Sequence, residues 1–236
     1  QLTRHQAGDG LADKLLIGLA AEDFQIQRLL EVLREDRAEP GEEIRRLDDD
    51  VDALYSGVKL YLAQMPREDL AEQEGRRWAE IIELAINLEQ AGDIIEHMAS
   101  KVQNLKTAKR RSFSDSGLEE LGQLHAQLSA NLRLGLSVFI SGDSHGARQL
   151  LQQKRQFRKL ERELAHSHVH RLHRQVVESI ETSAAHLELI ADMKRLNSLF
   201  CSAAYPALEG PCKPRTAGDT NREVLPSEPH LPGRPA

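Results

Sequence analysis

The chain has 236 residues, a formal net charge of −6 and few aromatic residues, which make up 4% of it. Its 40% hydrophobic and 29% charged residues are typical of helical bundles, so we predict an all-α fold. The negative charge and the lack of a broad basic face argue against nucleic acid as the main partner. No apolar run approaches the roughly 20 residues that cross a bilayer. We find no nucleophile with a matched base and no glycine-rich phosphate loop, and therefore predict that the chain is not an enzyme.

The first half contains three predicted helices, at residues 11–33, 42–64 and 67–107, with apolar residues at three- and four-residue steps. Pro40 precedes the second helix and Pro66 ends it, because proline is tolerated only in the first turn of a helix. The basic segment from Lys106 to Arg111 complements the negative end of the third helix dipole. A loop that binds anions or contacts lipid is the alternative for this segment.

The second half contains three more predicted helices. Ser114-Asp115-Ser116 is a capping sequence for a fourth helix, which Ser141-Gly142-Asp143 closes. A phosphorylation site at Ser112 or Ser114 is the alternative to this cap. The fifth helix is expected at residues 144–174 with His168 on its buried side, and Ser179–Thr182 resembles a cap before a sixth helix that runs to Tyr205 and stops at Pro206.

Residues 209–236 form a segment rich in proline, glycine and charged residues with almost no apolar content. Such a segment cannot bury enough surface to offset its ordering entropy, so we predict that it is disordered. Cys201 and Cys212 have no metal-type spacing and are predicted to be free thiols in a reducing compartment.

Pairs of carboxylates four residues apart are the most informative feature of the sequence. Two residues that are four apart on a helix have their side chains on the same face. Each of these pairs directly follows residues of an apolar stripe. The pairs are Asp48 and Asp52, Glu89 and Asp93, and Glu188 and Asp192. The last two pairs lie 99 residues apart in similar surroundings, which indicates an internal duplication. Like charges at this spacing repel one another, so we expect a metal ion or basic side chains nearby.

Two simpler interpretations remain open at this point. The acidic pairs fit a solvated flank that is balanced by basic residues of a neighbouring helix. On the fifth helix, His166, His170 and His173 share one face at steps of four and three, which suits a transition metal but also suits exposed polar positions.

Two segments resemble the last helix of PhoU-type domains: Asn87-Leu88-Glu89-Gln90-Ala91-Gly92-Asp93, and the run from Glu181 to Ser198 with Ala203-Ala204-Tyr205-Pro206 after it. The chain up to about Glu209 is similar to the cytoplasmic PhoU-like region of bacterial sodium/phosphate cotransporters, including Ser137-Val138-Phe139-Ile140-Ser141-Gly142-Asp143. The resemblance implies two tandem antiparallel three-helix bundles, at residues 1–111 and 112–208, followed by the tail at 209–236.

The resemblance also implies metal clusters on the acidic motifs. In the first half Asp48 and Asp52 would face Glu89 and Asp93, four carboxylates suited to iron, zinc, manganese or magnesium. In the second half, alignment of the apolar stripes puts Lys154 and Arg158 where the first half has its aspartates. These cations would repel a metal, and we expect them to pair with Glu188 and Asp192.

The function implied by the resemblance is a cytosolic domain that regulates sodium-dependent phosphate uptake. We then expect a transmembrane transporter portion upstream of Gln1 and a location on the cytoplasmic face of the bacterial inner membrane, as part of a membrane protein. Self-association into a homo-oligomer is a further open alternative. The rival functions are a stand-alone PhoU-type regulator of phosphate signalling that binds metal, and a structural helical bundle that binds other proteins.

Overall fold

The computed structural model describes residues 23–34, 72–107 and 112–209, together with single helical residues at 18, 20, 21, 53, 56, 57 and 60. Its helices are α3 (Glu72–Thr107), α4 (Asp115–Ser141), α5 (Ser144–His173), α6 (Val177–Glu181), α7 (Ser183–Phe200), the 3-10 turn η2 (Cys201–Ala203) and α8 (Ala204–Glu209). No strand occurs among the described residues, and the predicted all-α fold is confirmed. None of the described helices is long and apolar enough to cross a membrane.

Several sequence predictions fall outside these ranges. They concern most of the helix at residues 42–64, including Asp48 and Asp52, the side chains of Lys106 to Arg111, Cys212, and the tail beyond Glu209. The division into two bundles at residue 111 therefore stays a prediction.

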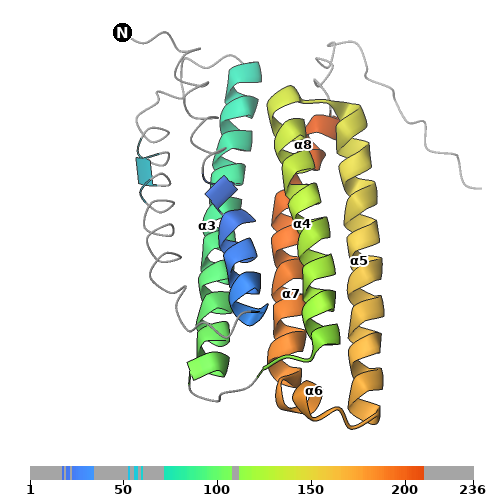
Figure 1. Cartoon of the computed structure of the whole chain (residues 1–236). Helices are drawn as coiled ribbons and strands as arrows, with labels where there is room; N and C mark the ends of the chain where they lie inside the picture. The colour runs from blue at the N-terminus through green and yellow to red at the C-terminus, as the bar shows by residue number, and fades with distance from the viewer. Residues whose placement is uncertain are drawn as a thin grey trace, which may run out of the picture.

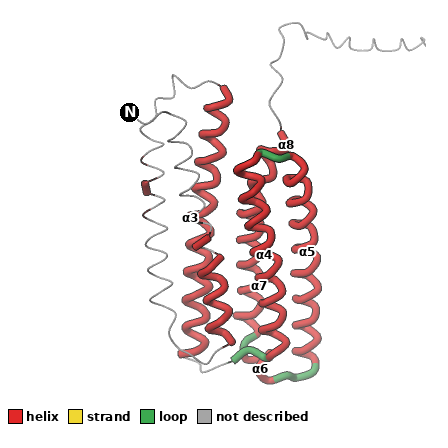
Figure 2. The backbone as a smooth tube through the Cα atoms, turned by 45° about the horizontal axis from the view of Figure 1, so that its top comes forward, coloured by secondary structure: helices red, strands yellow, loops and turns green. Residues whose placement is uncertain are grey.

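The long helices run side by side along one axis of the molecule (Figure 1). α4 packs against both α5 and α7, and α3 packs against α7. Residues 23–34, drawn in blue, lie beside α3 in this view and in the rotated view of Figure 2. The short helices α6 and α8 lie at opposite ends of the group formed by α4, α5 and α7.

The turn between α4 and α5 follows from two residues. Gly142 ends α4 in the left-handed region at φ 63°, and its N–H donates to the carbonyl of Val138. Asp143 caps α5, where its carboxylate accepts hydrogen bonds from the backbone N–H groups of His145 at 2.9 Å and Gly146 at 2.8 Å. At the other end of α4, Ser114 accepts from the N–H of Gly117, which confirms the cap that the sequence predicts.

Most of the buried apolar residues form one cluster that contains residues of both halves. It contains residues from the helical segment 23–34 and from α3, α4, α5 and α7, among them Ile26, Leu88, Leu124, Phe157 and Leu189. Polar contacts cross the same boundary. The amide of Asn87 donates to Ser202 at 2.8 Å, and the guanidinium of Arg133 lies 3.3 Å from the carboxylate of Asp23. The helices of the two halves are therefore packed together rather than joined only by a linker.

α4 and α7 approach each other closely. A Cβ atom added at Gly135 would lie 2.7 Å from the carbonyl oxygen of Phe200, so only glycine fits there. One turn away, the buried amides of Asn131 and Asn197 are joined by a hydrogen bond of 2.6 Å.

The C-terminal end of the fold differs from its prediction. α7 ends at Phe200 and gives way to η2 and then to α8, so the expected single helix up to Tyr205 is divided. Pro206 does not end a helix. It lies in the first turn of α8, where a missing N–H removes no internal helical hydrogen bond. Cys201 in η2 is a buried free thiol, and burial raises its pKa to about 11.

Candidate functional site

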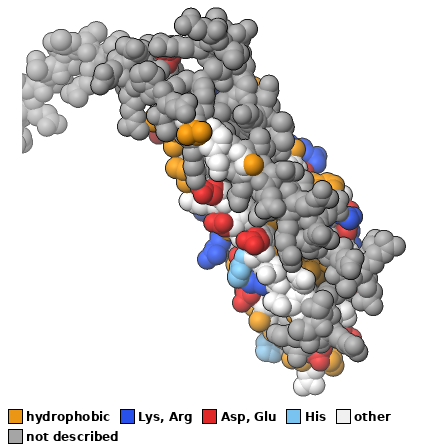
Figure 3. Space-filling model, turned by 90° about the vertical axis from the view of Figure 1, so that its left-hand side faces the viewer, with side chains coloured by type: hydrophobic (Ala, Val, Ile, Leu, Met, Phe, Trp, Pro, Cys, Tyr) orange, Lys and Arg blue, Asp and Glu red, His pale blue; other side chains and the backbone are white. Residues whose placement is uncertain are grey.

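The acidic pair of α3 lies at the surface of the molecule. Glu89 is half-buried and Asp93 is exposed. Figure 3 shows acidic side chains interspersed with basic ones and histidine on the described part of the face that it presents. Their predicted partners, Asp48 and Asp52, lie outside the described residues. Among the described residues, no group of three or more His, Cys, Asp or Glu side chains could hold a metal ion. The described residues thus supply two of the four carboxylates of the predicted cluster.

The acidic pair of α7 is joined to α3 by a lysine. The ammonium nitrogen of Lys101 lies 2.9 Å from a carboxylate oxygen of Glu188 and 3.2 Å from one of Asp192. The Asp192 side chain is only 5% exposed, whereas that of Glu188 is 55% exposed. Burial by itself would lower the pKa of Lys101, but its hydrogen bonds to the two carboxylates raise that pKa above its ordinary value. Lys101 is therefore protonated and holds both acidic side chains.

This pairing corrects one prediction. A cation does occupy the acidic pair of α7, but it comes from α3 and not from Lys154 or Arg158. The ammonium of Lys154 instead lies 3.4 Å from the hydroxyl of Tyr205 and 5.4 Å from the centre of its ring. The alignment of the two halves predicted the wrong lysine because it compared stripes within each half, whereas the contact joins the halves.

The α7 pair does not fit a metal ion. A divalent cation at Glu188 and Asp192 would lie beside the ammonium of Lys101, which has no acceptor to offer it. Among the described residues, the remaining charged group near Asp192 is Arg195, at 3.6 Å, and it is also a cation.

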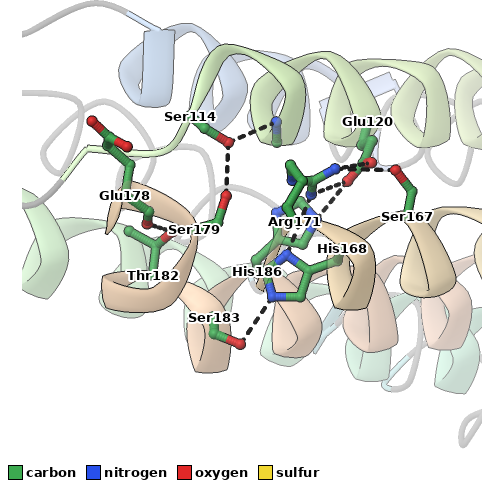
Figure 4. Close-up of polar contacts among 11 residues, drawn as sticks. Ser114, Glu120, Ser167, His168, Arg171, Glu178, Ser179, Thr182, Ser183 and His186 are labelled. Carbon is green, nitrogen blue, oxygen red and sulfur yellow. Dashed lines mark hydrogen bonds and ion pairs between the residues drawn. The ribbon is translucent and has the colours of Figure 1, made fainter. Parts of the chain in front are cut away.

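A second polar cluster is buried where α4, α5 and α7 meet (Figure 4). The Glu120 carboxylate of α4 accepts hydrogen bonds from both terminal nitrogens of Arg171 of α5, and from Nε2 of His186 of α7 at 3.0 Å. The side chains of Glu120 and Arg171 are 7% and 13% exposed. Burial alone would raise the pKa of Glu120, but the hydrogen bonds from His186, Arg171 and Ser167 lower it to about 2.

Two histidines complete this cluster. The rings of His168 and His186 stack with their centres 4.7 Å apart, and Nε2 of His168 lies 2.9 Å from the hydroxyl of Ser183. Both histidines are buried, as the sequence predicts for His168. Burial and the nearby groups of His186 and Arg171 lower the pKa of His168 to about 4, so it is neutral at physiological pH.

An open groove of about 840 Å³ lies beside this cluster. It is lined by side chains of both charges from α4 and α5, including Glu119, Glu163, His166 and His170, and by Arg174 directly after α5. His166 and His170 are exposed here, in keeping with the polar-surface interpretation of the histidine face.

Glu120, Arg171 and His186 were not identified from the sequence. Glu120 precedes Leu124 by four residues and His186 precedes Ile190 by four, so both occupy positions of an apolar stripe. A charged or imidazole side chain at such a position is the signal that could have found them.

Part of the chain matches a known domain family, and most of it is similar in sequence to named proteins. Residues 23–102 match the PhoU domain. A protein of Salmonella typhimurium, named "Putative inorganic phosphate export protein YjbB", is 56% identical over 183 residues, which are 77% of this chain and 34% of that protein. The protein of the same name in Escherichia coli K12 is 57% identical over 169 residues, 72% of this chain and 31% of its own length. The chain thus spans about a third of the length of the curated relatives it matches.

The fold is also that of a solved PhoU structure. The crystal structure of PhoU from Pseudomonas aeruginosa superposes with a TM-score of 0.72 and covers 85% of this chain and 94% of its own, at 16% sequence identity. At that identity the likeness concerns the helical fold alone.

The relatives contradict two predictions. A sodium/phosphate transporter portion upstream of Gln1, and a location on the cytoplasmic face of the inner membrane as part of that membrane protein, both followed from a resemblance to sodium-coupled uptake proteins. The relatives are named for phosphate export. Both predictions are therefore wrong for the sodium-coupled uptake protein that they assumed. The comparisons show a PhoU domain match over residues 23–102 and similarity to proteins named for phosphate export.

Proposed function

We propose that this chain is a PhoU-type regulatory module of phosphate homeostasis that acts in phosphate export. The observation that carries the proposal is the 56% identity over 183 residues to a protein named for inorganic phosphate export. The likeness of the helical fold to a PhoU structure supports the same role. Of the functions considered from the sequence, this one is nearest to the PhoU-type phosphate regulator.

The described surface suits a regulator that works by binding. Long rigid helices hold exposed side chains at fixed spacing, as on the outer face of α3, where Glu83, Asp93 and Glu96 are exposed. Several buried polar side chains form hydrogen bonds between helices, as in the Glu120 and Asn131 networks. We therefore assign recognition to the outer faces and stability to the buried clusters.

We propose further that Asp48, Asp52, Glu89 and Asp93 form a cation site on the first half. The support is their spacing, which predicts four carboxylates at one interface between two helices, together with the access to solvent that Asp93 retains. When such a cation is bound, it neutralises the like charges and allows the two helices to approach. The side chains that would hold it are hard oxygen ligands, which suit magnesium, manganese or iron.

The proposed role is tested by the phosphate content of cells. The coding region for residues 18–209 is removed in frame from the gene, and intracellular phosphate is measured in phosphate-rich and phosphate-poor media. We expect the difference in phosphate content from intact cells to depend on the supply of phosphate. If the chain is only a structural helical bundle, its removal should change the phosphate content by the same amount in both media, or not at all. Either result would refute the regulatory role.

A further inference from the structure

The contact between Lys101 and the acidic pair of α7 joins two distant segments of the chain. Lys101 lies near the C-terminal end of α3, and Glu188 and Asp192 lie one turn apart in α7. The ammonium group is within hydrogen-bond distance of both carboxylates at once. A cation between two carboxylates on one helix face is the arrangement that a metal site of this motif would have.

The charges around the buried carboxylate are balanced without a metal. Asp192 is the most buried of the three groups, and it faces Lys101 from α3 and Arg195 from its own helix. Arg195 is 71% exposed at 3.6 Å, whereas Lys101 is 19% exposed, so the lysine is the cation held in place beside Asp192. Two carboxylates and two cations leave this region with no net charge.

We propose that Lys101 is the resident cation of the α7 acidic motif, so that this motif fastens α3 to α7 and excludes metal ions. The lysine donates to both carboxylates with the three donors of one ammonium group. A divalent cation in the same place would have to displace that group from a partly buried position and leave it facing another positive charge. The two acidic motifs of the duplicated halves therefore differ in role, and this inference does not depend on a role in phosphate export.

Removal of the lysine should open the motif to a metal ion. The Lys101→Met variant keeps most of the side-chain length and loses the charge, so the two carboxylates of Glu188 and Asp192 keep only the exposed Arg195 of the two cations named above. We expect this variant of the full chain to bind one more Mn²⁺ than the unaltered protein in isothermal titration with MnCl₂. The additional binding should disappear in the double variant Lys101→Met with Asp192→Asn. Lys101→Arg, which keeps the positive charge, should bind no additional Mn²⁺.

Two variants that keep Lys101 test the proposal even if Lys101→Met does not fold. Glu188→Gln changes a side chain that is 55% exposed, and it should leave the stoichiometry of Mn²⁺ binding unchanged while Lys101 is present. Asp192→Asn with Lys101 intact should do the same. Loss of bound Mn²⁺ from either of these two variants would overturn the proposal. So would a folded Lys101→Met protein, checked by circular dichroism, that binds no more Mn²⁺ than the unaltered chain.

Discussion

The Glu120 carboxylate of α4 accepts hydrogen bonds from Arg171 of α5 and from His186 of α7, so that one buried anion joins three helices. The contact with His186 spans 66 residues of sequence, and the contact with Arg171 spans 51. Because each partner comes from a different helix, loss of this anion affects the packing of all three.

Replacement of Glu120 should therefore be strongly destabilising. Glu120→Gln keeps the shape of the side chain but leaves the buried guanidinium of Arg171 without its counter-charge. We expect a loss of about 3 kcal/mol in the free energy of unfolding, measured by urea denaturation. Glu119→Gln is the matched control, since Glu119 is the exposed neighbour on the same turn, and it should change stability by less than about 0.5 kcal/mol. Equal effects of the two variants would show that the Glu120 cluster is not a stabilising contact.

The same cluster predicts a loss of stability in acid. The pKa of His168 is about 4 in the folded protein against an ordinary value of 6.5, and the pKa of Glu120 is about 2 against 4.5. Between the two values of each group the unfolded chain binds a proton that the folded protein does not bind, so stability falls as the pH falls. His168 contributes to this loss from about pH 6.5 to 4, and Glu120 from about pH 4.5 to 2.

Urea denaturation at a series of pH values measures this dependence. His168→Gln should reduce the slope between pH 6.5 and 4, to which the lowered pKa of His125 also contributes, and leave the lower range unchanged. A slope in the upper range that is the same in the variant and in the unaltered protein would contradict the assignment to His168.

Two glycines should respond in opposite directions to the same substitution. Gly142 has φ 63°, and an added Cβ would meet no atom within 4 Å, so Gly142→Ala carries only the backbone strain of the left-handed region, about 1 kcal/mol. Gly75 lies within α3 with equally open space, and Gly75→Ala should stabilise the helix by about 0.5–1 kcal/mol. Thermal unfolding should show a lower Tm for the first variant and a higher Tm for the second. A lower Tm in both would mean that the conformation of the turn at Gly142 is not the cause.

The two acidic motifs should differ in their metal content. Four negative charges are predicted at Asp48, Asp52, Glu89 and Asp93, and each close contact between like charges costs on the order of 1–4 kcal/mol at the surface. Asp52→Ala combined with Glu89→Ala should therefore abolish most of the metal that co-purifies with the chain, and chelation should lower the Tm. Asp192→Asn should leave the metal content nearly unchanged. Elemental analysis of the purified proteins decides this: no metal in any of them would support the solvated-flank interpretation of the first motif.

Local chemistry explains which features could be predicted from the sequence. The ends of α4 follow from Ser114 and Gly142, because capping and the left-handed conformation depend on residues within one turn. The burial of His168 follows from its place on the stripe of α5. These features need no knowledge of how the helices pack.

The contacts that the sequence did not predict depend on packing between distant helices. Lys101 reaches Asp192 only because α3 lies against α7, and the two residues are 91 positions apart. The prediction that Pro206 ends a helix was wrong because the effect of a proline depends on its position within the helix. The chain turns at η2, and Pro206 then lies in the first turn of the new helix α8. The identities of these residues carry no local signal of either outcome.

The most direct test of the proposed role is the rate at which cells release phosphate. Cells loaded with radiolabelled phosphate are transferred to unlabelled medium, and efflux is followed in three strains: one with the intact gene, one lacking the coding region for residues 18–209, and one in which that region has been restored. We predict that removal changes the efflux rate several-fold and that restoration returns it to the original value. The same efflux rate in all three strains would contradict a regulatory role in phosphate export.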